Sequence, residues 1–212
     1  MSKQIEYFYS AHSAFAYLGS KQLMAICTEH RCQLIHRPME LSPVVEAVGS
    51  PPFAKRTQAH VDYFFGREIE RWAEWRDVPI INHRPTHHDN PLALAHGMLI
   101  AAVETGADID ALAHALLEAH WRDDIDLAKP EHLAAAAEAA GVAPAPLLDA
   151  ALSDPIQAIH AANTREAIER ELFGSPTYLV DGDPFYGQDR LELVERALST
   201  PFRHTAFHNP AV

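Results

Sequence analysis

The first part of the chain alternates between apolar runs of strand length and a segment with helical spacing. Residues 5–9, IEYFY, are short, aromatic and β-prone, which predicts a strand. After a polar step, apolar residues recur at roughly helical spacing and predict a helix over about 14–30. Residues 32–39, CQLIHRPM, are a second strand candidate that Pro38 ends. Strand, helix and strand at this spacing predict a βαβ unit with a parallel strand pair and a right-handed crossover.

The middle of the chain, from Leu41 to about Arg170, has the texture of successive helices. The segment 129–142, KPEHLAAAAEAAGV, has Pro130 near its start and Gly141 at its end, which is the usual punctuation of a helix. The alanine runs favour helix and not low-complexity disorder.

The last part returns to strand texture. Residues 175–182, SPTYLVDG, form a β-prone run that ends in Asp181-Gly182, a strong hairpin turn signal. A short returning strand, PFYG, and a final helix, DRLELVERALS, complete the chain. The pattern predicts an α/β fold, a thioredoxin-like domain of residues 1–42 and 171–212 with an all-helical domain, 43–170, inserted after the first βαβ unit.

Composition and charge narrow the function classes. The 212 residues are 48% hydrophobic and carry a formal net charge of -12, which argues against nucleic acid or an anionic membrane as a partner. No apolar run has the length of a signal peptide or a membrane span, so we expect a cytoplasmic location. The cysteines, Cys27 and Cys32, lack the Cys-x-x-Cys spacing of a redox pair and are interpreted as buried thiols.

Two motifs, one near each end of the chain, carry a family resemblance. FYSAHSAFAYLG, 8–19, together with FGSPTYLVDGDPFYGQDRLELV, 173–194, resembles the kappa-class glutathione transferases and the 2-hydroxychromene-2-carboxylate isomerases. These are thioredoxin-fold proteins with an inserted helical domain, in a wider group that includes bacterial thiol-disulfide oxidoreductases. The resemblance extends over essentially the whole chain.

Ser13 is the residue that the resemblance makes catalytic. In the family a serine takes the place of the first redox cysteine, commonly within Ser-Pro-aromatic-Ser; here the tetrad is Ser13-Ala14-Phe15-Ala16. The serine is implied to donate a hydrogen bond to the sulfur of bound glutathione, because a hydroxyl donor at a helix N-terminus favours the thiolate. The alternative is a simple helix N-cap. Ser10 and His12 are weaker candidates.

The C-terminal motif supplies the other expected cofactor contacts. Gly-Ser-Pro-Thr matches the family's cis-proline loop, so we predict a cis bond before Pro176 and binding of the cysteinyl backbone of glutathione by Ser175. Gln188 and Asp189 match positions that hold its γ-glutamyl end. The alternative for Asp189 is an acidic helix cap with Glu192.

Two further positions are taken from the resemblance. Ser50 falls at the approximate place of a family asparagine, while the family's lysine has no match, with Lys55 and Arg56 nearby. Asn90 matches a substrate-contacting asparagine, and a solvated loop is its alternative. The histidine-rich stretch 84–90 lacks the ligand spacing of a zinc site, so no metal is expected.

The resemblance implies a glutathione-dependent cis–trans isomerase that acts on a small aromatic acid. The alternatives are a kappa-like glutathione transferase or peroxidase, or a non-catalytic thiol- or peptide-binding module. Phe53, Phe64 and Phe65 are expected to cover the aromatic substrate. Because relatives are often dimers, a homodimer is compatible with the resemblance.

Overall fold

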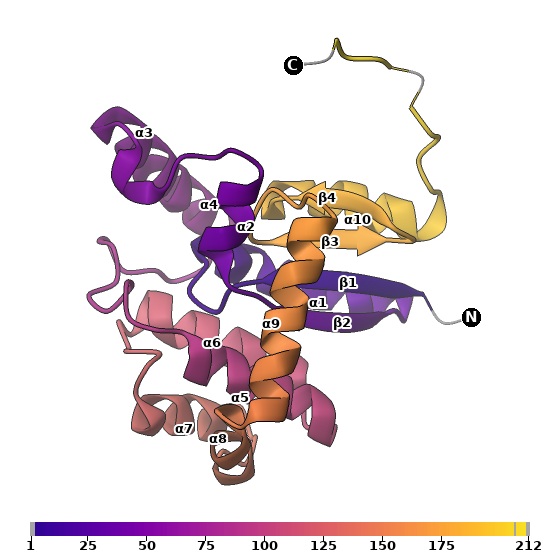
Figure 1. The fold of residues 1–212 in the computed structure, drawn as a ribbon. Helices are drawn as coiled ribbons and strands as arrows, with labels where there is room; N and C mark the ends of the chain where they lie inside the picture. The colour runs from indigo at the N-terminus through magenta and orange to yellow at the C-terminus, as the bar shows by residue number, and fades with distance from the viewer. Residues whose placement is uncertain (1–2, 206, 211–212) are drawn as a thin grey trace.

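One mixed sheet lies at the centre of the fold (Figure 1). The computed structural model describes residues 3–205 and 207–210, with the side chain of Phe53 outside that description. Among these residues, strands pair in the order β2-β1-β3-β4; β1 and β2 are parallel, and β3 is antiparallel to β1 and to β4. The expected βαβ unit and the expected terminal hairpin are both confirmed. The strands are β1 (Gln4–Tyr9), β2 (Gln33–Pro38), β3 (Thr177–Val180) and β4 (Asp183–Tyr186).

The hairpin turn has the conformation that its sequence predicts. Asp181 and Gly182 have φ values of 51° and 86°, and they connect the paired residues Val180 and Asp183. Positive φ at both central residues gives a turn whose twist matches that of the flanking strands. The turn therefore sets the register of β4, which leads directly to Gln188 and Asp189.

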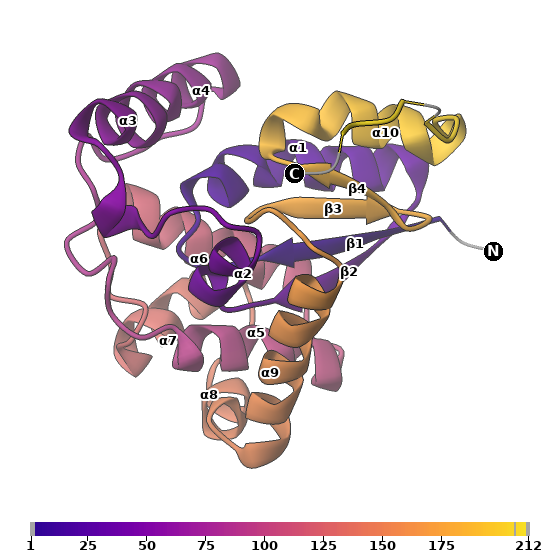
Figure 2. The same cartoon turned by 45° about the horizontal axis from the view of Figure 1, so that its top comes forward.

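Two helices cover one face of the sheet (Figure 2). They are α1 (Ala14–His30), with the bounds that the sequence predicts, and α10 (Leu191–Ser199). Gly19 lets them approach closely, because a Cβ at this position would lie 2.7 Å from Cβ of Gln188. The N-terminus of α1 is thereby held against the segment that opens the last helix.

The helical segment covers the opposite face and one end of the sheet (Figures 1 and 2). Helices α5 and α9 pack against β2. The helices of this segment are α2 (Leu41–Ala47), η1 (Phe53–Lys55), α3 (Gln58–Asp62), the π-helix η2 (Tyr63–Arg67), α4 (Glu68–Arg76), α5 (Ala93–Thr105), α6 (Ile109–Arg122), α7 (Pro130–Ala139), α8 (Ala145–Ala151) and α9 (Asp154–Glu169). The 3-10 helix η3 (Gln188–Arg190) lies outside it, between β4 and α10.

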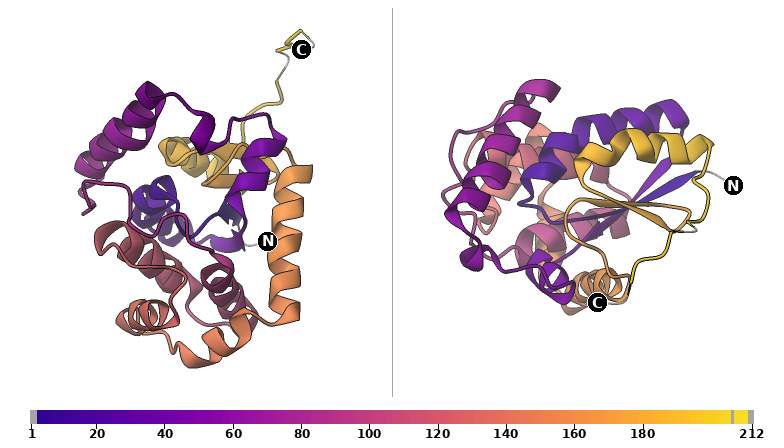
Figure 3. Two further views of the ribbon diagram at one scale, coloured as in Figure 1. Left: turned by 60° about the vertical axis from the view of Figure 1, so that its left-hand side comes forward. Right: turned by 90° about the horizontal axis from the view of Figure 1, so that it is seen from above.

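The sheet and the helical segment share one core. The largest buried apolar cluster runs from Ile5 and Tyr178 in the sheet to Leu99 and Leu133 in the helices. The expected boundary after residue 42 falls inside α2, and the boundary after residue 170 falls just past the end of α9. Helices α3, η2 and α4 form an arm beside the N-terminal end of α1 (Figure 3).

Candidate active site

Ser13 is both a helix cap and a contact to the opposite loop. Its Oγ accepts a hydrogen bond from the amide of Ala16 at 3.2 Å, which makes it the N-cap of α1. The same hydroxyl donates to the carbonyl of Ser175 at 3.2 Å. The peptide bond between Ser175 and Pro176 is cis, as expected. From the sequence, Ser13 was either a simple helix N-cap or a residue of the active site. In the structure it caps α1 and also contacts the cis-proline loop.

The β1–α1 loop holds Ser175 at a second point. The amide of Ser10 donates to Oγ of Ser175 at 3.0 Å, so both side-chain and main-chain oxygens of Ser175 are bound by this loop. Ser13 and Ser175 are 7% and 8% exposed, respectively. Ser13 and Ser175 are 162 residues apart in the sequence, and their hydrogen bond joins the two motifs into one unit.

A cavity of about 240 Å³ lies beside this unit. Its apolar wall comes from α1, the arm and β4, and its polar wall from the cis-proline loop and the start of the last helix. Ser13 is not among the residues that line the cavity, whereas Ser175, which accepts its hydrogen bond, is. Of the aromatic residues expected over the substrate, Phe64 lines it. The lining residues are Phe15, Phe64, Glu68, Trp72, Ser175, Tyr186, Gly187, Gln188, Asp189 and Arg190.

Gln188 lines the cavity while its side-chain oxygen is held by the arm. Arg76 donates from Nε to Oε1 of Gln188 at 2.7 Å and from Nη2 to its carbonyl at 3.1 Å. Because the oxygen of the amide is occupied, the amide nitrogen is the group that Gln188 can offer to a ligand. The orientation of this amide is thus set by a residue of the helical segment.

Asp189 sits on the polar wall without capping the helix. Within the described chain, η3 and α10 have no side-chain cap hydrogen bond, and Asp189 instead pairs with Arg190 at 2.6 Å. Gly187 allows the carboxylate to fold over the backbone, since a Cβ there would lie 2.4 Å from Oδ1 of Asp189. The capping alternative for Asp189 is therefore not found.

Two expected binding residues lie elsewhere. Ser50 is outside the cavity lining, and its amide donates to the carbonyl of Val45. Asn90 is also outside the lining, and its amide group donates to the buried carboxylate of Asp126 at 2.9 Å. The structure thus gives both residues local contacts, and it brings together Ser13, Ser175, Pro176, Gln188 and Asp189.

Comparison with known proteins decides the family. A family model described as a DSBA-like thioredoxin domain matches residues 4–199. The chain belongs to the DSBA-like thioredoxin domain family.

The relatives of this DSBA-like domain agree with the resemblance seen at its two ends. The 2-hydroxychromene-2-carboxylate isomerase of Pseudomonas sp. (strain C18) is 24% identical over 198 residues, which are 92% of this chain and 89% of the relative. The isomerase of the same name from Sphingobium xenophagum is 25% identical over 199 residues, with 93% and 99% covered. These names support an enzyme with an isomerase-like function.

A solved structure bears out the fold. A 2-hydroxychromene-2-carboxylate isomerase superposes with a TM-score of 0.77 at 22% sequence identity, covering 92% of this chain and 94% of that chain. The expected thioredoxin-like fold with inserted helices is confirmed. Among the described residues of this DSBA-like domain, no helix combines the length and apolarity needed to cross a membrane.

A buried histidine pair beneath the β1–α1 loop was not found from the sequence. The amide of Ala11 donates to Nε2 of His96 at 3.0 Å, so the ring proton of His96 is on Nδ1. That proton is directed at Nε2 of His160, 2.9 Å away. Oγ of Ser10 lies 3.2 Å from the same Nε2 of His96 and 2.9 Å from Nδ1 of His12. His96 thus fixes the loop that carries Ser13.

A second histidine pair adjoins the first through His12. Nδ1 of His120 is 2.9 Å from the carbonyl of Ile125, which directs its proton there and leaves Nε2 to accept from Nδ1 of His88 at 3.0 Å. The rings of His12 and His88 meet edge to face at 4.6 Å. Burial lowers the pKa of His12 to about 4 and that of His88 to about 2. These rings are neutral at physiological pH.

Glu40, His96 and His160 place possible ligand atoms within 4.8 Å of one another. A metal on Nδ1 of His96 would move the ring proton to Nε2, where it would face the amide hydrogen of Ala11. The hydrogen bonds from Ala11 to His96 and from His96 to His160 therefore favour a proton, and not a metal ion, between the two histidine rings.

Proposed function

We propose that this protein is a glutathione-dependent cis–trans isomerase that acts, like 2-hydroxychromene-2-carboxylate isomerase, on an aromatic conjugated keto acid. The observation that carries the proposal is the position of Ser13. Its hydroxyl lies at the N-terminus of α1, against the cis-proline loop and beside an aromatic-lined cavity. The names of the relatives, which match over 92% or more of this chain, supply the reaction class.

The residues around the cavity fit glutathione. An extended tripeptide needs main-chain partners, a partner for its amine and donors for its carboxylates. Ser175 offers its backbone amide, Asp189 a carboxylate and Gln188 an amide nitrogen. Arg56 offers a positive charge near Tyr186: burial raises the pKa of Tyr186, and the charge of Arg56 offsets part of that rise. We propose that Arg56 takes the part of the lysine that the family resemblance implies and this chain lacks.

Ser13 can turn its hydrogen from Ser175 to a sulfur anion at a net gain. The bond to the neutral carbonyl is long, at 3.2 Å, and such bonds contribute about 0.5–1.5 kcal/mol. A bond to a charged acceptor contributes about 1.5–3 kcal/mol. The amide of Ala16 continues to donate to Oγ during this change and makes the hydroxyl a better donor. Ser13 therefore favours the ionised form of a thiol held in front of it.

When bound, glutathione would supply a thiolate for reversible addition to a conjugated carbon of the substrate. The chain itself orients and shields the reactants. Phe15, Phe64 and Trp72 offer aromatic surfaces to an aromatic substrate, and Phe15 and Phe64 already contact each other at a centroid distance of 5.1 Å. The carboxylate of Glu68 lies on the same wall as Phe64 and Trp72, so charged groups line both sides of the cavity.

The test combines glutathione titration calorimetry with an isomerisation assay on 2-hydroxychromene-2-carboxylate. We expect glutathione to bind, and Ser13→Ala to slow isomerisation about tenfold to a hundredfold, the cost of one hydrogen bond to a charged group. The thiol pKa of bound glutathione should rise, which the ultraviolet absorbance of the thiolate reports. Asp108→Ala is the matched control, because it removes the side-chain cap of α6 far from this cavity.

Absence of glutathione binding at millimolar concentration would sink the proposal. Binding with conjugation of electrophiles but no isomerisation would favour a kappa-like transferase or peroxidase. Binding without turnover of either substrate class would favour a thiol- or peptide-binding module.

A further inference from the structure

Cys27 and Cys32 occupy the two matched positions of a helix C-terminal motif. Arg31 ends α1 in the left-handed conformation with φ 50°. The amide of Cys32 donates to the carbonyl of Cys27 at 3.0 Å, and the amide of Arg31 donates to the carbonyl of Thr28 at 3.3 Å. This pair of bonds defines a Schellman motif, in which the side chains at the first and last positions commonly touch. Here both of those side chains are thiols.

The two thiols interact with each other and differ in character. The residue Cys27 is 8% exposed. Burial, together with a hydrogen bond to Cys32, raises the pKa of its thiol well above the usual value. Cys27 therefore keeps its proton. Cys32 is only partly buried, so a reagent from solvent meets Cys32 first.

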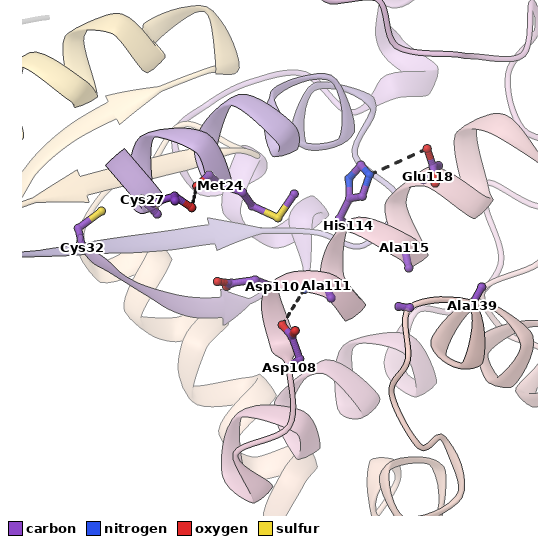
Figure 4. A pocket seen from close by; sticks show the side chains of 12 residues that line it. Met24, Cys27, Cys32, Asp108, Asp110, Ala111, His114, Ala115, Glu118 and Ala139 are labelled. Atoms are coloured by element: carbon purple, nitrogen blue, oxygen red, sulfur yellow. Dashed lines mark hydrogen bonds and ion pairs between the residues drawn. The ribbon is translucent and has the colours of Figure 1, made fainter. Parts of the chain in front are cut away.

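Both cysteines line a second cavity, of about 640 Å³, between α1 and α6 (Figure 4). Figure 4 shows Cys27 and Cys32 toward one end of this cavity and Glu118 toward the other. The lining includes the carboxylates of Asp108, Asp110 and Glu118, of which Glu118 pairs with Arg122 at 2.9 Å. The cavity lies at the end of α1 opposite to Ser13.

We propose that Cys27 and Cys32 are a peroxide-responsive thiol pair that closes reversibly into an intramolecular disulfide, separate from the Ser13 site. The oxidant is hydrogen peroxide, which is small and neutral. Cys32 gives up its proton, and its sulfur attacks one peroxide oxygen; the O–O bond breaks, the departing hydroxide takes up that proton to become the first water, and Cys32 becomes a sulfenic acid. The sulfur of Cys27 then attacks the sulfur of Cys32, the S–O bond breaks, and the proton of Cys27 leaves with the hydroxyl group as water. Two thiols are oxidised, and one peroxide is reduced to two waters.

The simpler role of this pair is to form the apolar contact of the Schellman motif. A direct measurement distinguishes that structural role from disulfide formation. The purified full chain is exposed to hydrogen peroxide, and its intact mass and non-reduced peptide map are recorded. We expect the loss of two hydrogens per chain, a peptide cross-linked between Cys27 and Cys32, and full recovery of both thiols with dithiothreitol. Survival of both thiols would overturn the proposal, as would oxidation of Cys32 to the sulfinic acid while Cys27 stays reduced.

Two near-isosteric variants test the order of the steps. Cys27→Ser should leave Cys32 as a sulfenic acid that dimedone traps, and Cys32→Ser should leave Cys27 unmodified under the same exposure. A sulfenic acid found on Cys27 in the Cys32→Ser variant would contradict the assignment of first attack. Because the wild-type chain alone reports disulfide formation, the test stands even if a variant folds poorly. Ser153→Ala, at the start of α9, is the control, because the Ser153 side chain makes no cap hydrogen bond; this variant should close the disulfide as the wild type does.

Discussion

Arg76, the last residue of α4, binds Gln188, the first residue of η3, through two hydrogen bonds of 2.7 and 3.1 Å. A third bond from the same guanidinium reaches the side chain of Gln22 on α1. One cation thus joins the arm, the first helix and the last helix at the wall of the smaller cavity. The orientation of the Gln188 amide depends on it.

Arg76→Met should therefore weaken both the fold and the binding of glutathione. Gln188 is 1% exposed, so its side-chain oxygen would lose its partner while buried, at a cost of about 1–3 kcal/mol. Urea unfolding measures the stability, and calorimetry measures the affinity. Arg67→Met is the control on the exposed side of the arm, where the pair with Glu70 contributes about 0–1 kcal/mol. Equal effects of the two substitutions would rule out the role given to Arg76.

Ser13→Ala should cost stability as well as activity. The substitution removes the N-cap of α1 and leaves the amide of Ala16 without its partner, which costs about 0.5–2 kcal/mol. Asp108→Ala removes the cap of α6 and should cost a similar amount. Chemical denaturation of the two variants makes the comparison. Because Ser13, unlike Asp108, contacts the cis-proline loop, a similar loss of isomerisation in both variants would mean that helix stability, and not the hydroxyl, controls turnover.

The protein should lose stability as the pH falls below about 6.5. Burial lowers the pKa values of His12, His88, His96, His120 and His160 in the folded state. Above pH 6.5 these rings are neutral in both states and add no pH dependence. Below pH 6.5, these imidazoles bind protons in the unfolded chain but stay neutral in the folded chain. Each ring therefore lowers the unfolding free energy by up to about 1.4 kcal/mol per pH unit. The loss continues down to the folded pKa, about 4 for His12 and about 2 for His88.

Denaturant unfolding at several pH values between 8 and 5 checks this slope, which should be shallow above 6.5 and steep below. His88→Gln removes one of the titrating rings and should flatten the acid limb relative to the wild type. A flat profile down to pH 5 in the wild type would contradict the neutral state assigned to these rings.

Gly182→Ala should destabilise the hairpin by about 1–2 kcal/mol, because its φ of 86° places a side chain in the left-handed region. Asp181→Asn keeps a residue that tolerates this region and should be nearly neutral. Thermal unfolding ranks the two variants. If Asp181→Asn proved the more damaging, the turn would not have the two-residue form seen between Val180 and Asp183.

Local signals in the sequence were enough for the elements that frame the site. The aromatic run before Ser10, the helix that follows Ser13 and the Asp181-Gly182 turn each carry a pattern of short range, and the structure has all three where they were expected. Ser175 and Pro176 were placed by motif resemblance, and the cis bond agrees.

Contacts between distant helices had no such signal. His96 and His160 lie 64 residues apart, on the apolar helix α5 and the amphipathic helix α9, and nothing in either segment marks them as partners. Arg76 and Gln188 are 112 residues apart, and their bond depends on how the arm packs on α1. For Asn90 the resemblance predicted a substrate contact, with a solvated loop as the alternative, whereas the acidic partner that binds it, Asp126, comes from beyond the next two helices.

The hydrogen bond between Ser13 and Ser175 also has a consequence for biosynthesis. During translation, the first half of the candidate site leaves the ribosome 162 residues before its partner. An N-terminal fragment, a prematurely terminated chain or a separately expressed helical segment therefore lacks the pair. In split-protein complementation, two inactive halves regain function when they meet. The hydrogen bond between Ser13 and Ser175 would then form between the two halves.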